Sequence, residues 1–191
     1  ILDPTVSSQV PGIAAQLTAT SSALAALTTN STVVTPGGQP GAAVFNANPV
    51  NGVAVFSVAA SSLFSNGLVQ QIELNANGAS SIVVNVTGQN VLYNSGNFVG
   101  AFTSNFARAN VIWNFVDATD INLQRGFSGA ILAPNAHLTN INDIDGSVFV
   151  GSFSQFGEVH LPNYTGVIPA PGAALLLAAA GVLAGRRRRA A

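Results

Sequence analysis

Short apolar segments separated by turn residues dominate the chain from Ala42 onward. Three of them are rich in β-branched and apolar side chains and predict strands: Val53–Val58, Ser81–Val86 and Asn110–Phe115. Glycine, asparagine and aspartate lie between the segments, as tight turns require. Trp113 and Phe115 alternate along the third segment and are predicted to face a core, with sugar binding by exposed aromatic rings as the alternative. The pattern therefore predicts a mainly β fold.

One segment has helical periodicity instead. Pro11 suits the first turn of a helix, and Ile13, Leu17, Leu24 and Leu27 then fall on one stripe. The opposite side is polar and is expected to face water: Gln16, Thr18, Ser21, Ser22 and Thr28. We predict one helix that ends at residues 30–31 and packs its stripe against the β core.

A faint internal repeat follows the predicted strands. Ser128–Leu138 aligns with Asp145–Gln155 at an offset of 17, which pairs Ile131 with Val148 and Ala133 with Val150. A glycine before an alternating apolar strand, repeated at this period, is typical of one coil of a β-solenoid. Two copies also suit a β-hairpin. We predict a β-solenoid-like domain with one packed helix, with a β-sandwich as the alternative.

The C-terminal residues have a different pattern. Gly172–Gly185 contains no charged or polar side chain, and Arg186, Arg187, Arg188 and Arg189 follow it. At about 1.5 Å per residue, such a helix is shorter than the roughly 30 Å core of a bilayer. We expect a hydrophobic helix that is a marginal membrane span, with its arginines on the cytoplasmic side.

This tail resembles the PEP-CTERM family of bacterial sorting signals. The matching residues are Ile168, Pro169, Ala170, Pro171 and Gly172, with Ala170 where the family has glutamate. The resemblance implies recognition by an exosortase-type sorting enzyme and delivery to the envelope of a Gram-negative-type bacterium. An ordinary hydrophobic anchor with a positive flank is the alternative.

Composition suits an exported protein. Cysteine is absent, charged residues make up 7% of the chain, and residues 1–185 hold two arginines against seven acids, a net charge of −5. This balance excludes a basic surface for nucleic acid. Because Ile1 is no initiator and the tail requires export, we expect a longer precursor with a signal peptide.

Candidate chemistry is sparse. Glu158 and His160 lie on the same face of a predicted strand, where a general base or metal pair is weighed against a structural role that fixes the closing strand. Zinc would need a further ligand. Asn142–Gly146 is rich in oxygen, but it departs from the EF-hand pattern, so tight turns are weighed against a calcium corner. We predict no cofactor and no enzyme activity.

The chain also resembles the choice-of-anchor A family of bacterial surface or adhesin domains. Four blocks carry the resemblance, in order: Asn110–Asp120, Gly129–Ala136, Ile144–Gly151 and Gly157–Gly166. Within them, the resemblance implies structural roles for Trp113, Asn114, Phe115, Pro134, Asn135, Gly146, Glu158 and His160. It also implies that residues 1–166 are the C-terminal portion of such a domain and that residues 167–191 are a separate sorting segment.

The expected function follows from these resemblances. We predict an exported, non-enzymatic surface or matrix protein that adheres to polysaccharide, to protein fibres or to itself. An ice-binding β-solenoid is one alternative, although Thr-x-Thr occurs only at Thr18–Thr20. A hydrolase of surface polymers is the other, and it would use Glu158 and His160.

Overall fold

The computed structural model of the chain describes residues 4–168, which form mainly β-strands. Its elements follow in chain order: α1 (Pro4–Ala25), β1 (Thr32–Val34), β2 (Gly41–Asn46), β3 (Val53–Ala59), α2 (Ala60–Leu63), β4 (Val69–Asn75), β5 (Ser81–Thr87), β6 (Asn90–Tyr93), β7 (Asn97–Phe98), the 3-10 helix η1 (Gly100–Thr103), α3 (Asn105–Asn110), β8 (Val111–Phe115), β9 (Asp120–Leu123), β10 (Phe127–Ser128), β11 (Ala130–Asn140), β12 (Ile144–Asp145), β13 (Val148–Gln155) and β14 (Val159–His160).

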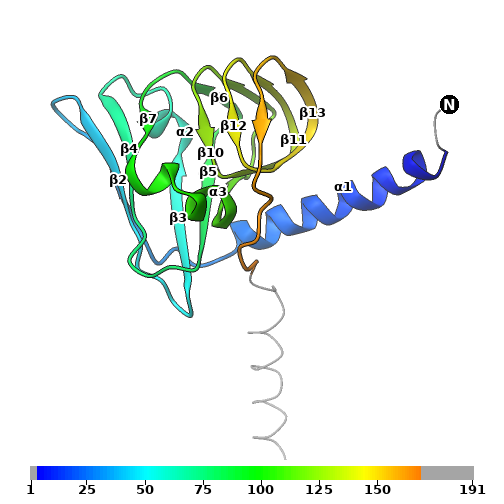
Figure 1. The fold of residues 1–191 in the computed structure, drawn as a ribbon, viewed down its shortest axis with the longest axis horizontal. Helices are drawn as coiled ribbons and strands as arrows, with labels where there is room; N and C mark the ends of the chain where they lie inside the picture. The colour runs from blue at the N-terminus through cyan, green and yellow to red at the C-terminus, as the bar shows by residue number, and fades with distance from the viewer. Residues whose placement is uncertain (1–3, 169–191) are drawn as a thin grey trace, which may run out of the picture.

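These strands form three sheets. The largest has seven strands in the order β3-β5-β8-β11-β9-β6, with β13 also paired to β11. The others have the orders β1-β2-β4-β7 and β10-β12-β14. Among the strand pairs of residues 4–168, only β1 and β2 run antiparallel. Figure 1 shows the strands stacked side by side, from β2 at one end to β13 at the other.

The register of the stack confirms the predicted pairing of the repeat. Ile131 lies beside Val148 and Ala133 beside Val150, in parallel strands. A hairpin is thereby wrong for this repeat, because its strands would be antiparallel. Past Ala133 the register shifts, so that His137 lies beside Ser152. The mainly β class is confirmed.

An aromatic cluster fills the interior, as predicted for Trp113 and Phe115, which are both buried. The Trp113 ring packs against Phe45, Phe98 and Phe127 at centroid distances of 5.7, 5.5 and 5.5 Å. Its indole Nε1 donates to the Ser128 carbonyl at 2.9 Å, which satisfies the buried polar atom of the side chain. This cluster joins strands that lie far apart in sequence.

Helix α1 covers the outer face of the large sheet, which confirms one packed helix (Figure 1). Leu24 is fully buried there against Val55, Val83 and Ile112, and Leu17 and Leu27 pack at the edge of this second core. Three of the four predicted stripe residues, Leu17, Leu24 and Leu27, therefore make this contact, with Leu24 at its centre.

A buried polar network also fastens α1 to the sheet. The Ser21 hydroxyl donates to Asn114 Oδ1 at 2.6 Å, and Asn114 Nδ2 donates to the Ser21 carbonyl at 2.9 Å and to Asn85 Oδ1 at 2.8 Å. Asn85 Nδ2 donates in turn to the Leu24 carbonyl at 2.8 Å. The network satisfies the buried amides that neighbouring strands β5 and β8 place under the helix.

Three predictions about this helix are wrong. It starts at Pro4 and ends at Ala25, so that Pro11 lies inside it, where water can replace the lost hydrogen bond of an exposed turn. Ser21 faces the sheet rather than solvent, because Asn114 offers it a buried partner. Ile13 is 53% exposed, since this half of α1 projects past β13 (Figure 1).

Candidate functional site

The last turn of the stack, β13 and β14 with the segment up to Tyr164, is the candidate site. Within residues 4–168, β13 pairs only with β11 and β14 only with β12. Each therefore has one edge without a strand partner. Such an edge presents backbone N–H and C=O groups that another chain can bind.

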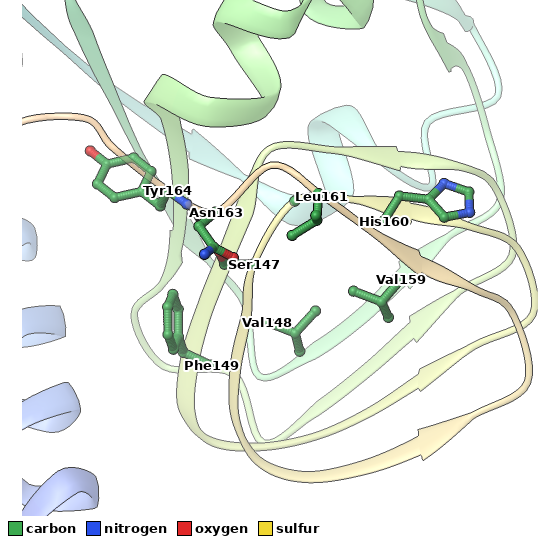
Figure 2. Close-up of a pocket in the computed structure, with 9 residues that line it drawn as sticks. Ser147, Val148, Phe149, Val159, His160, Leu161, Asn163 and Tyr164 are labelled. Atoms are coloured by element: carbon green, nitrogen blue, oxygen red, sulfur yellow. Dashed lines mark hydrogen bonds between the residues drawn. The ribbon is translucent and has the colours of Figure 1, made fainter.

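A cavity of about 550 Å³ opens at this end of the stack. In Figure 2, Val148, Val159 and Leu161 point into the space that the last turn encloses, whereas Phe149 and Tyr164 lie on the side of α1. Leu161 is 77% exposed, and Phe156, which follows β13 directly, is 75% exposed. The end of the interior core is thus uncovered, in contrast to the aromatic cluster behind it.

Four charged or ionisable side chains cluster at one rim of this turn. His160 Nε2 lies 2.8 Å from Glu158 Oε2, and His160 Nδ1 lies 3.1 Å from Asp145 Oδ1. Arg108, from α3, binds the other Asp145 oxygen at 3.0 Å. The hydrogen bond to Glu158, followed by the one to Asp145, raises the pKa of His160 above its ordinary value. The cluster ties β14 to β12 and β12 to α3.

Both ring nitrogens of His160 have carboxylate partners, Asp145 at Nδ1 and Glu158 at Nε2. Residues 4–168 contain no group of three or more His, Cys, Asp or Glu side chains arranged to hold a metal ion. The same-face prediction for Glu158 and His160 is confirmed by their contact.

A second histidine sits on the outer face of the last two strands. His137 Nδ1 lies 2.7 Å from the Ser152 hydroxyl and Nε2 lies 3.1 Å from that of Ser154. These bonds join β11 to β13 past the register shift. The two His137 bonds therefore fix β13 on β11, while the opposite edge of β13 has no strand partner in the part of the chain that the structure describes.

Comparison with known proteins identifies the family. A family model described as "Putative Ice-binding-like adhesive domain" matches residues 3–161. The chain belongs to this adhesive family. Neither a curated protein nor a solved structure matches it. The matched range includes α1, all the strands and the rim cluster, and the family places the adhesive domain at a surface or extracellular location.

The other motif residues of the adhesive domain serve its framework. Asn114 holds α1, and Gly146 has a φ of 149° where a Cβ would collide with the Gly129 carbonyl oxygen. Pro134 is half-buried and Asn135 exposed at the register shift of β11. The loop Asn142–Gly146, which was weighed as a calcium corner, makes turn contacts: Asn142 Nδ2 donates to the Gln124 carbonyl at 2.8 Å.

The predicted sorting segment lies outside the described residues, except for Val167 and Ile168, which are exposed. Pro169, Ala170, Pro171, Gly172 and the four arginines are not among residues 4–168. None of the helices in that range combines the length and apolar character needed to cross a membrane.

Sequence reasoning missed two parts of the site. One is Arg108. Only two arginines precede the tail, and this rarity was the one sign in the sequence that Arg108 has a specific partner. The open edge of β13 had a signal too, because Val148–Gln155 contains no charged residue and no proline.

Proposed function

We propose that the chain is a non-enzymatic adhesive domain whose contact surface is the uncovered last turn. The family match over residues 3–161 is the observation that supports this most directly. The exposed Leu161 and Phe156 beside an open strand edge supply the apolar surface that adhesion requires. Its ligand would be a polysaccharide, a protein fibre or the domain itself.

The finer identity is part of the same proposal. The resemblance of four sequence blocks to the choice-of-anchor A family supports a surface role, and the parallel stack supports a short β-solenoid as its architecture. The tail from Ile168 to Arg189 supports export, membrane insertion and processing by an exosortase-type enzyme in a Gram-negative-type bacterium. Mass spectrometry of the mature C-terminus tests this: a new end within residues 169–172 supports sorting, and an intact Arg189 contradicts it.

Adhesion is tested with microspheres that carry the 191-residue chain, washed over surfaces coated with polysaccharides, protein fibres or the chain itself. Leu161→Ser and Phe156→Ser should each reduce retention severalfold, because each removes exposed apolar area at the last turn. Val34→Ser is the matched control, since Val34 is 58% exposed but belongs to β1 at the opposite end. Retention on no surface, or equal loss for Val34→Ser, contradicts the proposal.

Ice binding is the second candidate, because the family description itself is ice-binding-like. The Thr18 and Thr20 hydroxyls, however, donate to the Ala14 and Gln16 carbonyls of their own helix at 3.0 and 2.9 Å. A gap between the melting and freezing temperatures of ice in solutions of the chain would favour this candidate over adhesion to polymers.

An assay of surface-polymer hydrolysis distinguishes an enzyme from an adhesin. If the domain is adhesive only, polymer incubated with the chain keeps its length, and Glu158→Gln and His160→Ala change nothing. Polymer cleavage that both substitutions abolish would contradict the non-enzymatic proposal.

A further inference from the structure

Strands β3 and β13, the first and last strands of the large sheet in chain order, differ in whether their outer edges are hydrogen-bonded. At the first end, the outer edge of β3 is already occupied: the Asn30 and Ser31 amides both donate to the Val55 carbonyl at 3.1 Å. The Asn30 side chain accepts from the Val55 amide at 2.8 Å and donates to the Val53 carbonyl at 3.0 Å. The outer edge of β3 is therefore capped in the manner of a strand neighbour.

Strand β13 at the other end has no such cap among residues 4–168; the Tyr164 amide donates to Ser147 Oγ, on the residue before the strand, at 3.0 Å. Strand β13 is eight residues long and carries none of the charges or prolines by which edge strands are usually protected. Behind its edge, the cavity lined by Val148, Val159 and Leu161 exposes the end of the core. An open edge and an open core coincide at one place.

Helix α1 extends over this open edge. Figure 1 shows the N-terminal half of α1 running past β13. The packed half ends at Leu17, whereas Val10 and Ile13 are 55% and 53% exposed. A groove of about 170 Å³ lies between these residues and the Val150–Gly151 part of β13. Seven residues of helix span about 10 Å, which is about two strand spacings. Val10 and Ile13 thus stand over the place of a further strand.

The chain itself indicates what fits such a place. One turn earlier, Ile131-Leu132-Ala133 occupies the equivalent position, and Val148-Phe149-Val150 repeats it. In each triplet the central residue packs toward α1, and the two outer residues pack toward the interior. A strand at the next position meets apolar surface on both faces, Val10 and Ile13 on one and the open cavity on the other.

On the basis of the adhesive function above, we propose that β13 is a docking edge for an extended polypeptide strand of another protein. The strand is uncharged, has at least three consecutive apolar residues, and adds parallel to β13 beneath the overhanging half of α1. Backbone hydrogen bonds to the edge provide affinity, and the two apolar faces provide selection. The partner of the adhesive domain is then a protein fibre with exposed strands rather than a polysaccharide.

Binding is tested with a fluorescent peptide that has the sequence of residues 146–155, followed by fluorescence anisotropy against the 191-residue chain. The peptide should bind saturably. Ile13→Glu should weaken binding at least about tenfold, because it places an unpaired charge over the strand. Gln16→Glu, an exposed position on the same helix, is the matched control and should leave binding unchanged. Urea unfolding of both variants shows that the fold is retained.

The direction of the added strand is tested by disulfide trapping, since the chain has no cysteine. Parallel pairing in register puts Gln155→Cys of the chain beside Gln155→Cys of the peptide, and this pair should cross-link faster than a peptide carrying Val148→Cys. The reverse order contradicts the parallel strand. Failure of the peptide to bind also overturns the proposal, as does a dimer of the chain in sedimentation that the peptide disrupts, since a second copy then occupies the edge.

The strand-docking proposal and the adhesive function can fail independently of each other. Microspheres that adhere to polysaccharide while the peptide does not bind would leave the adhesive function intact and remove the strand partner. Peptide binding without retention on any surface would do the opposite.

Discussion

At the scale of single residues, Asn114 connects the helix to two strands of the sheet. Its amide bonds Ser21 on α1 and Asn85 on β5, and all three residues are buried. Removing this side chain leaves polar groups of both partners without water or a partner. The network should therefore contribute more to stability than its number of hydrogen bonds suggests.

We predict that Asn114→Ala lowers the free energy of unfolding by about 3 kcal/mol, because the buried Ser21 hydroxyl and Asn85 Oδ1 both lose their bond to Asn114. Urea unfolding followed by tryptophan fluorescence measures it. Asn90→Ala is the control, since Asn90 is an exposed strand residue, and it should cost less than about 0.5 kcal/mol. Equal effects of the two substitutions would contradict the structural importance of the network.

His160 provides a second prediction at this scale. Its pKa is raised first by the hydrogen bond to Glu158 and then by the one to Asp145. Glu158→Gln should therefore shift the pKa of His160 downward, toward its ordinary value. An NMR titration of the His160 ring protons measures the shift, and Glu73→Gln, on β4, is the control.

The sign of the pH dependence follows from the same bonds. Because the folded pKa of His160 lies above the unfolded value, the rim cluster stabilises the fold below the unfolded pKa, and this contribution is lost as the pH rises through the folded pKa. An unchanged titration in Glu158→Gln would mean that the Glu158 contact does not persist in solution.

At the scale of elements, α1 is held unevenly. Its second half is fixed by Leu24 and the Ser21–Asn114 network, whereas its first half contains Pro11 and the exposed Val10 and Ile13. Local stability depends on such buried contacts.

We predict that backbone amides of residues 5–13 exchange with deuterium at least about tenfold faster than those of residues 17–25, because local opening of the first half breaks no core contact. Hydrogen exchange followed by mass spectrometry of peptic fragments measures this. The second half provides the internal control. Equal protection would mean that some other surface covers the first half, and the strand peptide should then slow exchange no further.

Much of this element-level picture could be predicted from the sequence. The strands β3, β5 and β8 were predictable because β-branched runs are bounded by turn residues, and the register of β11 on β13 was predictable from the repeat of glycine and apolar residues. The start of α1 was not, because an exposed helix tolerates Pro11. Ser21 was misplaced because its buried partner, Asn114, is distant in sequence.

The site was predictable only in part, for a similar reason. Glu158 and His160 are two residues apart, so strand geometry alone placed them together. Arg108 and the first half of α1 reach the last turn through the fold, and no local pattern gives such contacts. The sequence shows that Val148–Gln155 lacks charge. Only the structure shows that β13 has an unpaired edge in residues 4–168, which makes this lack of charge relevant to binding.

At the scale of the whole molecule, low charge is a property of the contact surface as well as of the composition. Residues 4–168 hold only two arginines, Arg108 and Arg125, and Arg108 is already paired with Asp145. β13 carries no charge, and Leu161 and Phe156 beside it are apolar. Long-range electrostatic attraction should therefore contribute little to adhesion, which should depend on apolar burial and backbone hydrogen bonds.

We predict that retention of microspheres changes less than about twofold between about 0.05 and 0.5 M NaCl, because screening acts on exposed charges and the contact surface has few. Sodium sulfate at equal ionic strength should strengthen retention, since excluded salts favour apolar burial. Flow-cell retention at each salt concentration measures both effects, and bare microspheres are the control. A steep loss of retention in NaCl would assign adhesion to the charged rim of Glu158, His160 and Asp145, and would place the contact on the side of β14 rather than on the edge of β13.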